Sequence, residues 1–135
     1  MSHQDPENVE NLRAFWDAWT PGEEMDMSLL DPDVAYEDTT LPDHIGEEYR
    51  GHEGIARAAE RWLDAYESLT IELERIVGTG DRLVSIHRAR SKARYTGIEE
   101  EGPLAYTWTF RNGKVIHFRS YRDTNEALRV AGLRG

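Results

Sequence analysis

The feature that most constrains the fold is a change of hydrophobic period near Thr70. Before this point, apolar residues recur at the three- and four-residue spacing of helices. After it they alternate as they do in strands, and turn residues separate four such runs. The last turn is Asn112-Gly113, a dipeptide that strongly favours a two-residue hairpin. Because hairpins join antiparallel neighbours, the second half of the chain predicts an antiparallel meander.

The expected strands of the meander cover 70–77, 82–95, 104–111 and 114–122. The first half of the chain predicts two main helices. One begins at Asp5-Pro6-Glu7, where a capping residue precedes a proline and an acid, and it ends before Thr20-Pro21-Gly22. The second main helix covers 51–69. Between the two main helices the sequence predicts a short helix over 24–30, an extended stretch over 34–38 and a loop over 39–50, and after the last strand it predicts a capped helix that ends at Val130.

Helices followed by antiparallel strands indicate an α+β fold, with the helices packed on one face of the sheet. A chain of 135 residues is expected to form a single domain, 1–135, and to bury a core without disulfides. It contains no cysteine, so neither a disulfide nor a thiolate metal site is available. Long helices against a curved antiparallel sheet predict a cone-shaped molecule with an internal pocket.

Charge and hydropathy exclude several classes of partner. The chain has 16 Lys and Arg against 26 Asp and Glu, a formal net charge of −10, so no nucleic acid is expected to bind. Mean hydropathy is −0.71, and no apolar run approaches the roughly 18 residues of a membrane span, so no membrane partner is expected. The first residues lack the apolar stretch of a signal peptide, which predicts a cytoplasmic protein.

Five segments carry a resemblance to one superfamily, in the same order along the chain: Phe15-Trp16-Asp17-Ala18-Trp19, Leu30-Asp31-Pro32-Asp33-Val34, Tyr49-Arg50-Gly51-His52-Glu53-Gly54-Ile55, Thr107-Trp108-Thr109-Phe110-Arg111-Asn112-Gly113-Lys114-Val115, and Phe118-Arg119-Ser120-Tyr121-Arg122-Asp123. Together they resemble the SnoaL-like, ketosteroid isomerase-like branch of the nuclear transport factor 2-like superfamily, which includes polyketide cyclases. The likeness covers about residues 9–133. It implies an α+β cone, a homodimer, and a hydrophobic cavity for a small apolar or polycyclic molecule. It also implies proton transfer by a carboxylate, with no metal and no cofactor.

Asp38 is the candidate general base. It ends the short extended stretch, where the resemblance places the base of ketosteroid isomerases, and a carboxylate beside an apolar cavity can accept a proton from carbon. The developing oxyanion then needs a hydrogen-bond donor. Here the sequence departs from the isomerases: their first-helix tyrosine aligns with Phe15, which cannot donate, and their oxyanion-binding aspartate falls on or beside Tyr106, which can. The alternative is that Asp38 only ends a strand and Tyr106 is a core aromatic.

His87 is the third catalytic candidate. The two faces of its expected strand are both mixed, so the period does not decide whether His87 points inward. If it does, a histidine that titrates near neutrality is the best acid–base partner for Asp38. The alternative is a hydrogen-bonded core histidine.

Aromatic side chains are expected to shape the ligand pocket, or, in the alternative interpretation, simply to fill the core. On the last strand, the resemblance places Phe118 and Ser120 inside and leaves His117, Arg119 and Tyr121 for the outer face or a dimer contact. The predicted pocket residues are Phe15, Trp19, Tyr36, Trp62, Tyr66, Trp108, Phe118 and Ser120.

Histidines and acids around the predicted loop suggest a metal site at first sight: His44, Glu47, Glu48, His52 and Glu53. Their spacing matches no zinc pattern, and adjacent residues at a helix start cannot present ligands as two histidines four residues apart do. No metal and no other cofactor are therefore expected.

Two functions from different classes remain open. The first is a cofactor-free proton-transfer enzyme of the isomerase, cyclase or hydratase type, in which Asp38 is the base and Tyr106, with His87, polarises the substrate oxygen. The second is a non-catalytic ligand-binding or scaffold domain of the same fold, which the missing donor at Phe15 favours. In both, the expected partners are a small molecule and a second copy of the chain.

Overall fold

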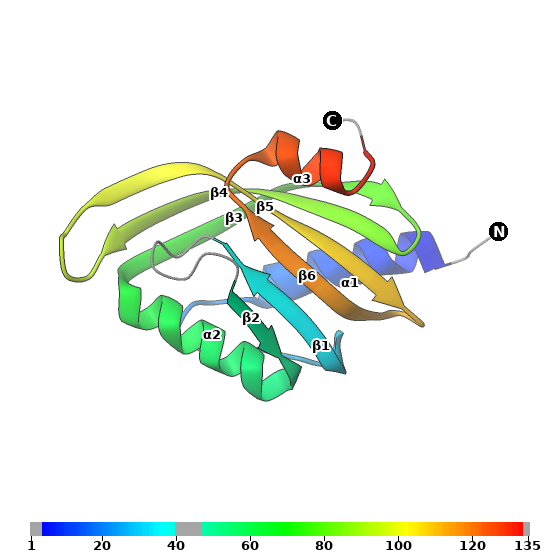
Figure 1. Cartoon of the computed structure of the whole chain (residues 1–135), viewed down its shortest axis with the longest axis horizontal. Coiled ribbons are helices and arrows are strands. Elements are labelled where there is room, and N and C mark those ends of the chain that lie inside the picture. The colour runs from blue at the N-terminus through cyan, green and yellow to red at the C-terminus, as the bar shows by residue number, and fades with distance from the viewer. Residues whose placement is uncertain (1–3, 40–46, 134–135) are drawn as a thin grey trace.

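The computed structural model describes residues 4–39 and 47–133, which form three helices and six strands (Figure 1). In chain order these are α1 (Gln4–Ala18), β1 (Leu30–Asp38), β2 (Glu47–Arg50), α2 (Gly51–Ala65), β3 (Tyr66–Thr79), β4 (Arg82–Ala93), β5 (Glu99–Arg111), β6 (Lys114–Tyr121) and α3 (Thr124–Val130).

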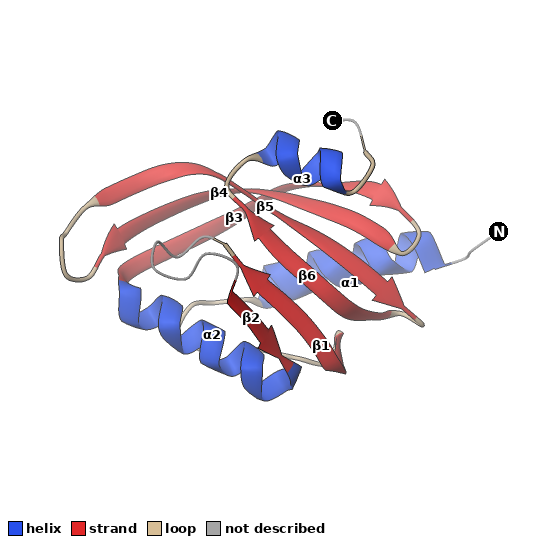
Figure 2. Cartoon of the chain, in the orientation of Figure 1, coloured by secondary structure: helices blue, strands red, loops and turns tan. Residues whose placement is uncertain are grey.

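The strands form one curved sheet in the order β2-β1-β6-β5-β4-β3 (Figure 2). As predicted, β3 to β6 form an antiparallel meander. β1 joins the far side of β6 in parallel, with Tyr36 opposite Phe118, and β2 pairs antiparallel with β1. The sheet is therefore mixed, because the connection from β1 to β6 runs through most of the chain rather than through a hairpin. The α+β class that the sequence predicts is confirmed.

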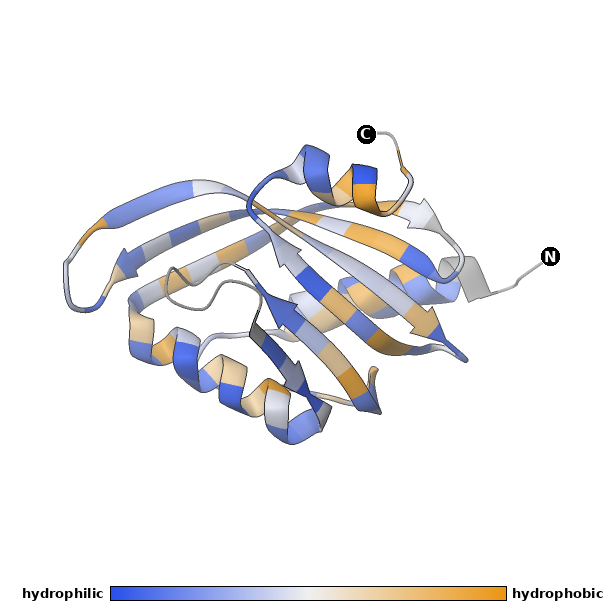
Figure 3. Ribbon diagram, viewed as in Figure 1, coloured by the Kyte–Doolittle hydropathy of each residue, from blue (hydrophilic) through white to orange (hydrophobic). Residues whose placement is uncertain are grey.

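Apolar and polar residues alternate along the strands (Figure 3), so each face of the sheet buries its own cluster. The inner face packs against α1 and α2, and the fully buried residues of this cluster include Leu12 of α1, Trp108 of β5 and Val115 of β6. The outer face packs against α3 through Val84, Ile86, Ala105, Tyr121, Ala127, Leu128 and Ala131. Tyr121, which the resemblance leaves for the outer face or a dimer contact, is thus covered by α3 within the same chain.

The predicted helix over 24–30 is wrong. Residues 21–29 are turns and irregular chain, and Leu30 already belongs to β1, opposite Val115 of β6. Seven residues are too few for a helix to persist without strong packing, and here strand pairing takes the last of them. The segment instead runs beside the inner face, where Met25 and Met27 pack against the core.

Three boundaries also differ. The second helix ends at Ala65 instead of continuing to Leu69, because Tyr66 already pairs with Ala93 of β4 and the sheet overrides the helical period. Of the predicted loop over 39–50, residues 47–50 form β2, and residues 40–46 lie outside the described residues. The strand expected over 104–111 begins earlier, since β5 starts at Glu99, opposite Lys92. No helix within the described residues is long and apolar enough to cross a membrane.

Candidate functional site

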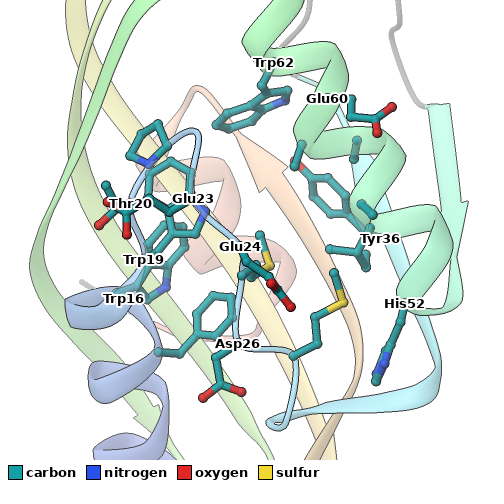
Figure 4. Close-up of a pocket in the computed structure, with 18 of the residues that line it drawn as sticks. Trp16, Trp19, Thr20, Glu23, Glu24, Asp26, Tyr36, His52, Glu60 and Trp62 are labelled. Atoms are coloured by element: carbon teal, nitrogen blue, oxygen red, sulfur yellow. The ribbon is translucent and has the colours of Figure 1, made fainter.

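A cavity of about 1040 Å³ lies between α1, the segment after it, α2 and the inner face of the sheet (Figure 4). It is large enough for a drug-sized molecule. Eight aromatic side chains contribute to its lining: Phe15, Trp16, Trp19, Tyr36, Trp62, Tyr106, Trp108 and Phe118.

The floor of the cavity is a stack of rings from three neighbouring strands. Phe118 of β6 lies between Tyr36 of β1 and Trp108 of β5, and both are its register partners in the sheet. The Phe118 centroid is 4.4 Å from that of Tyr36 and 4.7 Å from that of Trp108, with interplanar angles of 16° and 9°. All three side chains are buried, so the sheet register fixes this wall of the cavity.

The other walls come from the helices. Phe15 and Trp16 lie on the last turns of α1, Trp19 follows it, and Trp62 lies on α2 (Figure 4). Trp16 contacts Trp19 edge to face, with centroids 5.7 Å apart. Unlike the floor rings, these four side chains are half-buried and so remain accessible from the opening.

Asp38 lies at the inner end of the site and is fully buried. The indole Nε1 of Trp62 donates a hydrogen bond to Asp38 Oδ2 at 2.6 Å, and the hydroxyl of Ser120 donates to Oδ1 at 3.4 Å. The backbone N–H of Thr39 donates to Ser120 Oγ at 3.0 Å, which fixes that hydroxyl. Asp38 does not line the cavity itself, but Trp62 does. The carboxylate is therefore one side chain away from the cavity.

Two tyrosine hydroxyls connect this carboxylate to the cavity floor. Tyr36 is hydrogen-bonded to Ser120 and to Tyr106, and both tyrosines line the cavity. Burial, and then nearby charged or polar groups that include Asp38, raise the pKa of each tyrosine well above its usual value. Both phenols therefore stay protonated at neutral pH and can donate hydrogen bonds.

His87 points to the inner face, beneath α1. Its ring centroid is 4.3 Å from that of Trp16 and 5.5 Å from that of Tyr106. Nε2 lies 2.8 Å from Ser85 Oγ, which also accepts a hydrogen bond from Trp108 Nε1 at 2.7 Å. Burial lowers the pKa of His87 to about 3, so the ring is neutral near pH 7. The expectation that it titrates near neutrality is wrong, because periodicity carries no information about desolvation.

The structure brings most of the predicted pocket residues together. Phe15, Trp19, Tyr36, Trp62, Trp108 and Phe118 line the main cavity with Tyr106. Ser120 lies beneath Asp38, and His87 lies behind Trp16. Tyr66 differs: it lines a smaller cavity of about 190 Å³ with Leu69 and Arg122, because β3 begins at this residue and carries it past the end of α2.

The prediction missed the lining residues of the segment after α1, which include Met25 and Met27, and it missed Trp16 as a pocket residue. The segment also brings acidic residues to the lining, namely Glu23, Glu24 and Asp26, and α2 adds Glu60. A stretch with little regular structure carries no periodic signal that would assign its side chains to a cavity.

Of the residues that suggest a metal site, His52 and Glu53 lie in the first turn of α2. His52 Nε2 is 2.9 Å from the carbonyl oxygen of Leu30, which anchors the ring to β1. Glu48 accepts a hydrogen bond from Arg50 at 3.0 Å. His44 lies outside the described residues, as does the side chain of Glu47.

Comparisons with known proteins agree with this architecture. Residues 9–118 match the family model described as "SnoaL-like domain". An NTF2-like protein of unknown function from Burkholderia pseudomallei is 22% identical, with a TM-score of 0.74 over 97% of this chain and 98% of that one. A putative SnoaL-like polyketide cyclase from a Jannaschia species is 17% identical, with a TM-score of 0.72 over 100% of this chain and 98% of that one.

A protein with a ketosteroid isomerase-like fold from Catenulispora acidiphila, in complex with trimethylamine, is 19% identical, with a TM-score of 0.68 over 96% of this chain and 95% of that one. No curated protein matches. At these identities the solved structures show the fold alone, whereas the family model covers most of the chain. The chain belongs to the SnoaL-like domain family and has the NTF2-like fold.

Proposed function

We propose that this protein binds a small, mainly apolar or polycyclic molecule in the aromatic cavity and transfers a proton on it without a cofactor, with Asp38 as the base. The observation that carries the proposal is the buried Asp38 carboxylate, hydrogen-bonded to a tryptophan whose ring lines the cavity. The neighbour from Catenulispora acidiphila, solved with trimethylamine, supports binding of a small molecule by this scaffold.

In this proposal, Tyr36 and Tyr106 hold the substrate oxygen. Both phenols line the cavity and stay protonated, and a hydroxyl that donates to an oxygen stabilises the negative charge that develops there. Asp38 follows Tyr36 by two residues on the same face of β1, so a ligand that extends past Tyr36 and displaces the Trp62 indole meets the carboxylate. The proton leaves the substrate carbon for Asp38 and returns to another carbon of the same molecule.

His87 has a smaller role in the proposed proton transfer than the sequence predicts. It is neutral and lies behind Trp16, so it packs against the aromatic wall and does not move the proton. Its Nε2 contacts the Ser85 hydroxyl, which also accepts a hydrogen bond from Trp108. We therefore place Asp38 and Tyr106 in the proposed catalytic set and His87 among the groups that position the cavity wall.

Solvent-hydrogen exchange tests the catalytic part. A panel of cyclic and polycyclic ketones is incubated with the protein in D₂O, and deuterium uptake beside the carbonyl is followed by NMR. We expect wild-type protein to accelerate uptake for at least one ketone. Asp38→Asn should lower that rate by about 100-fold or more, whereas Glu37→Gln, on the opposite face of β1, should not. Equal rates for Asp38→Asn and wild type would exclude Asp38 as the base.

The second candidate is a non-catalytic ligand-binding domain of the same fold. The full burial of Asp38 and the donors that hold both of its oxygens favour it, because a base must be reachable by its substrate. Ketones that bind in the cavity without any exchange above the buffer rate would support this candidate over the enzyme.

A further inference from the structure

We propose, on the basis of the function proposed above, that the molecule bound in the main cavity is a cation: an organic ammonium group on an apolar body. Four acidic residues line the cavity, namely Glu23, Glu24, Asp26 and Glu60. Among the described residues that line it there is no Lys and no Arg. The one basic lining residue, His52, is held to the backbone of β1.

The four acidic residues come from two parts of the chain. Glu23, Glu24 and Asp26 come from the segment after α1, and Glu60 comes from α2 (Figure 4). In the parts of the chain that the structure describes, Glu23, Glu24 and Glu60 make no salt bridge. No direct ion pair among the described residues neutralises them, so they attract a cation that approaches the cavity and repel an anion.

Asp26 adds a weaker contribution. Hydrogen bonds from Ser28 lower the pKa of the Asp26 carboxyl, and the Lys114 ammonium lowers it further, so it stays ionised. The same Lys114 partly offsets the charge of Asp26. The experiment therefore uses Glu24, from the segment after α1, and Glu60, from α2.

Acidic side chains alone would only make a solvated surface. Here the same cavity is also lined by half-buried tryptophan rings: Trp16 and Trp19 on the side of α1, and Trp62 on α2 (Figure 4). The face of an indole ring attracts a cation more strongly than other aromatic faces do, and the attraction grows when water is excluded. An ammonium group bound against these rings would be stabilised by the ring faces and by the negative potential of the lining carboxylates.

A neutral molecule of the same shape would gain the same apolar contacts but nothing from the carboxylates. An anion would also have to approach four acidic side chains without a lysine or arginine in the lining to receive it. The cavity should therefore prefer a cation to its neutral isostere, and the neutral isostere to an anion.

Three probes of nearly equal size separate these cases. They are meta-hydroxyphenyltrimethylammonium, its neutral isostere meta-tert-butylphenol, and the anion meta-tert-butylbenzoate. Binding is measured by NMR titration of the indole N–H signals, which belong to Trp16, Trp19, Trp62 and Trp108, all lining the cavity. We expect the cation to bind about tenfold more tightly than meta-tert-butylphenol at low salt.

Matched variants connect the preference to the carboxylates. Glu24→Gln and Glu60→Gln should each weaken binding of the cation by about threefold and leave meta-tert-butylphenol unchanged. The control is Glu10→Gln, an exposed residue on α1 that does not line the cavity and should change neither affinity.

The outcomes distinguish this proposal from the function on which it rests. If meta-tert-butylphenol binds as tightly as the cation, the charge preference is wrong and the cavity remains a binding site. If both variants behave like Glu10→Gln, the carboxylates do not select the ligand and the proposal is also overturned. If no probe shifts the indole signals, the cavity does not bind molecules of this size, and the proposed function loses its support as well.

Discussion

At the scale of the residue, two fully buried polar side chains differ in how many of their polar atoms are hydrogen-bonded. Both carboxylate oxygens of Asp38 accept a hydrogen bond, one from Trp62 and one from Ser120. His87 has one partner, Ser85, and its Nδ1 has none among the described residues. A buried imidazole without a counter-charge is most stable when neutral, which explains the depressed pKa of His87.

His87 should make the protein sensitive to acid. Its pKa falls from 6.5 in the unfolded chain to about 3 in the folded protein, so the unfolded state binds the proton first. The stability that His87 contributes is complete above pH 6.5 and is lost as the pH falls toward 3. At pH 4 this loss should reach about 3 kcal/mol. Urea denaturation near pH 7 and near pH 4 measures it.

His87→Gln is the matched variant, because glutamine stays neutral and can still bond to Ser85. Its free energy of unfolding should fall less than that of the wild type between the two pH values. An equal fall would mean that other groups cause the acid sensitivity. The imidazole proton shifts of wild-type His87, followed by NMR from pH 7 to 3, give the same answer without a substitution.

At the scale of the element, Gly78 is a position in the hairpin between β3 and β4 that requires glycine. Gly78 has φ of +112°, and a Cβ there would lie 2.6 Å from the carbonyl oxygen of Arg82 and 3.0 Å from Leu133. An L-residue rarely adopts this backbone, and the nearest obstacle is backbone, which cannot turn away. Since β3 and β4 carry the sheet edge beneath α1, strain at Gly78 should destabilise the whole domain.

Gly78→Ala should therefore lower the free energy of unfolding by about 2 kcal/mol or more. Gly102→Ala on β5 is the control, because nothing lies within 4 Å of a Cβ at that position. Its effect should stay within about 0.5 kcal/mol. Urea denaturation of both variants gives the comparison, and equal losses would show that Gly78 tolerates a side chain.

At the scale of the whole molecule, part of the outer sheet face remains accessible beside α3. Glu37, His117 and Arg119 lie there, half-buried, and Arg119 Nη1 is 3.2 Å from Glu37 Oε2. We expect this face to form the contact of a homodimer, as the family resemblance implies. Light scattering at micromolar concentration should then give twice the chain mass of 15.5 kDa.

Arg119→Glu tests that contact, because it places a second carboxylate beside Glu37 and removes the cation of the pair. The variant should shift toward the monomer, while Arg111→Glu, at the exposed end of β5, should not. A wild-type monomer at micromolar concentration would contradict the expected dimer. An unchanged mass for Arg119→Glu would place the contact elsewhere.

Much of the architecture could be predicted because it follows from local chemistry. Asn112-Gly113 sets the β5–β6 hairpin, and Asp123 caps α3 through bonds from Asn125 and Glu126. The extension of α2 to Leu69 failed because pairing with β4 outweighed a local pattern that was compatible with a helix. Over 24–30, strand pairing takes only Leu30, and the short remainder is turns and irregular chain.

The α+β class and the antiparallel meander follow from the amino-acid sequence alone, since period and turn chemistry are local properties. The parallel pairing of β1 with β6, which stacks Tyr36, Phe118 and Trp108 into one floor, is visible only in the folded chain. The same is true of the Trp62 indole over Asp38 and of the acidic residues from two parts of the chain that line one cavity. These features depend on contacts between residues far apart in the chain, and on the water that those contacts exclude.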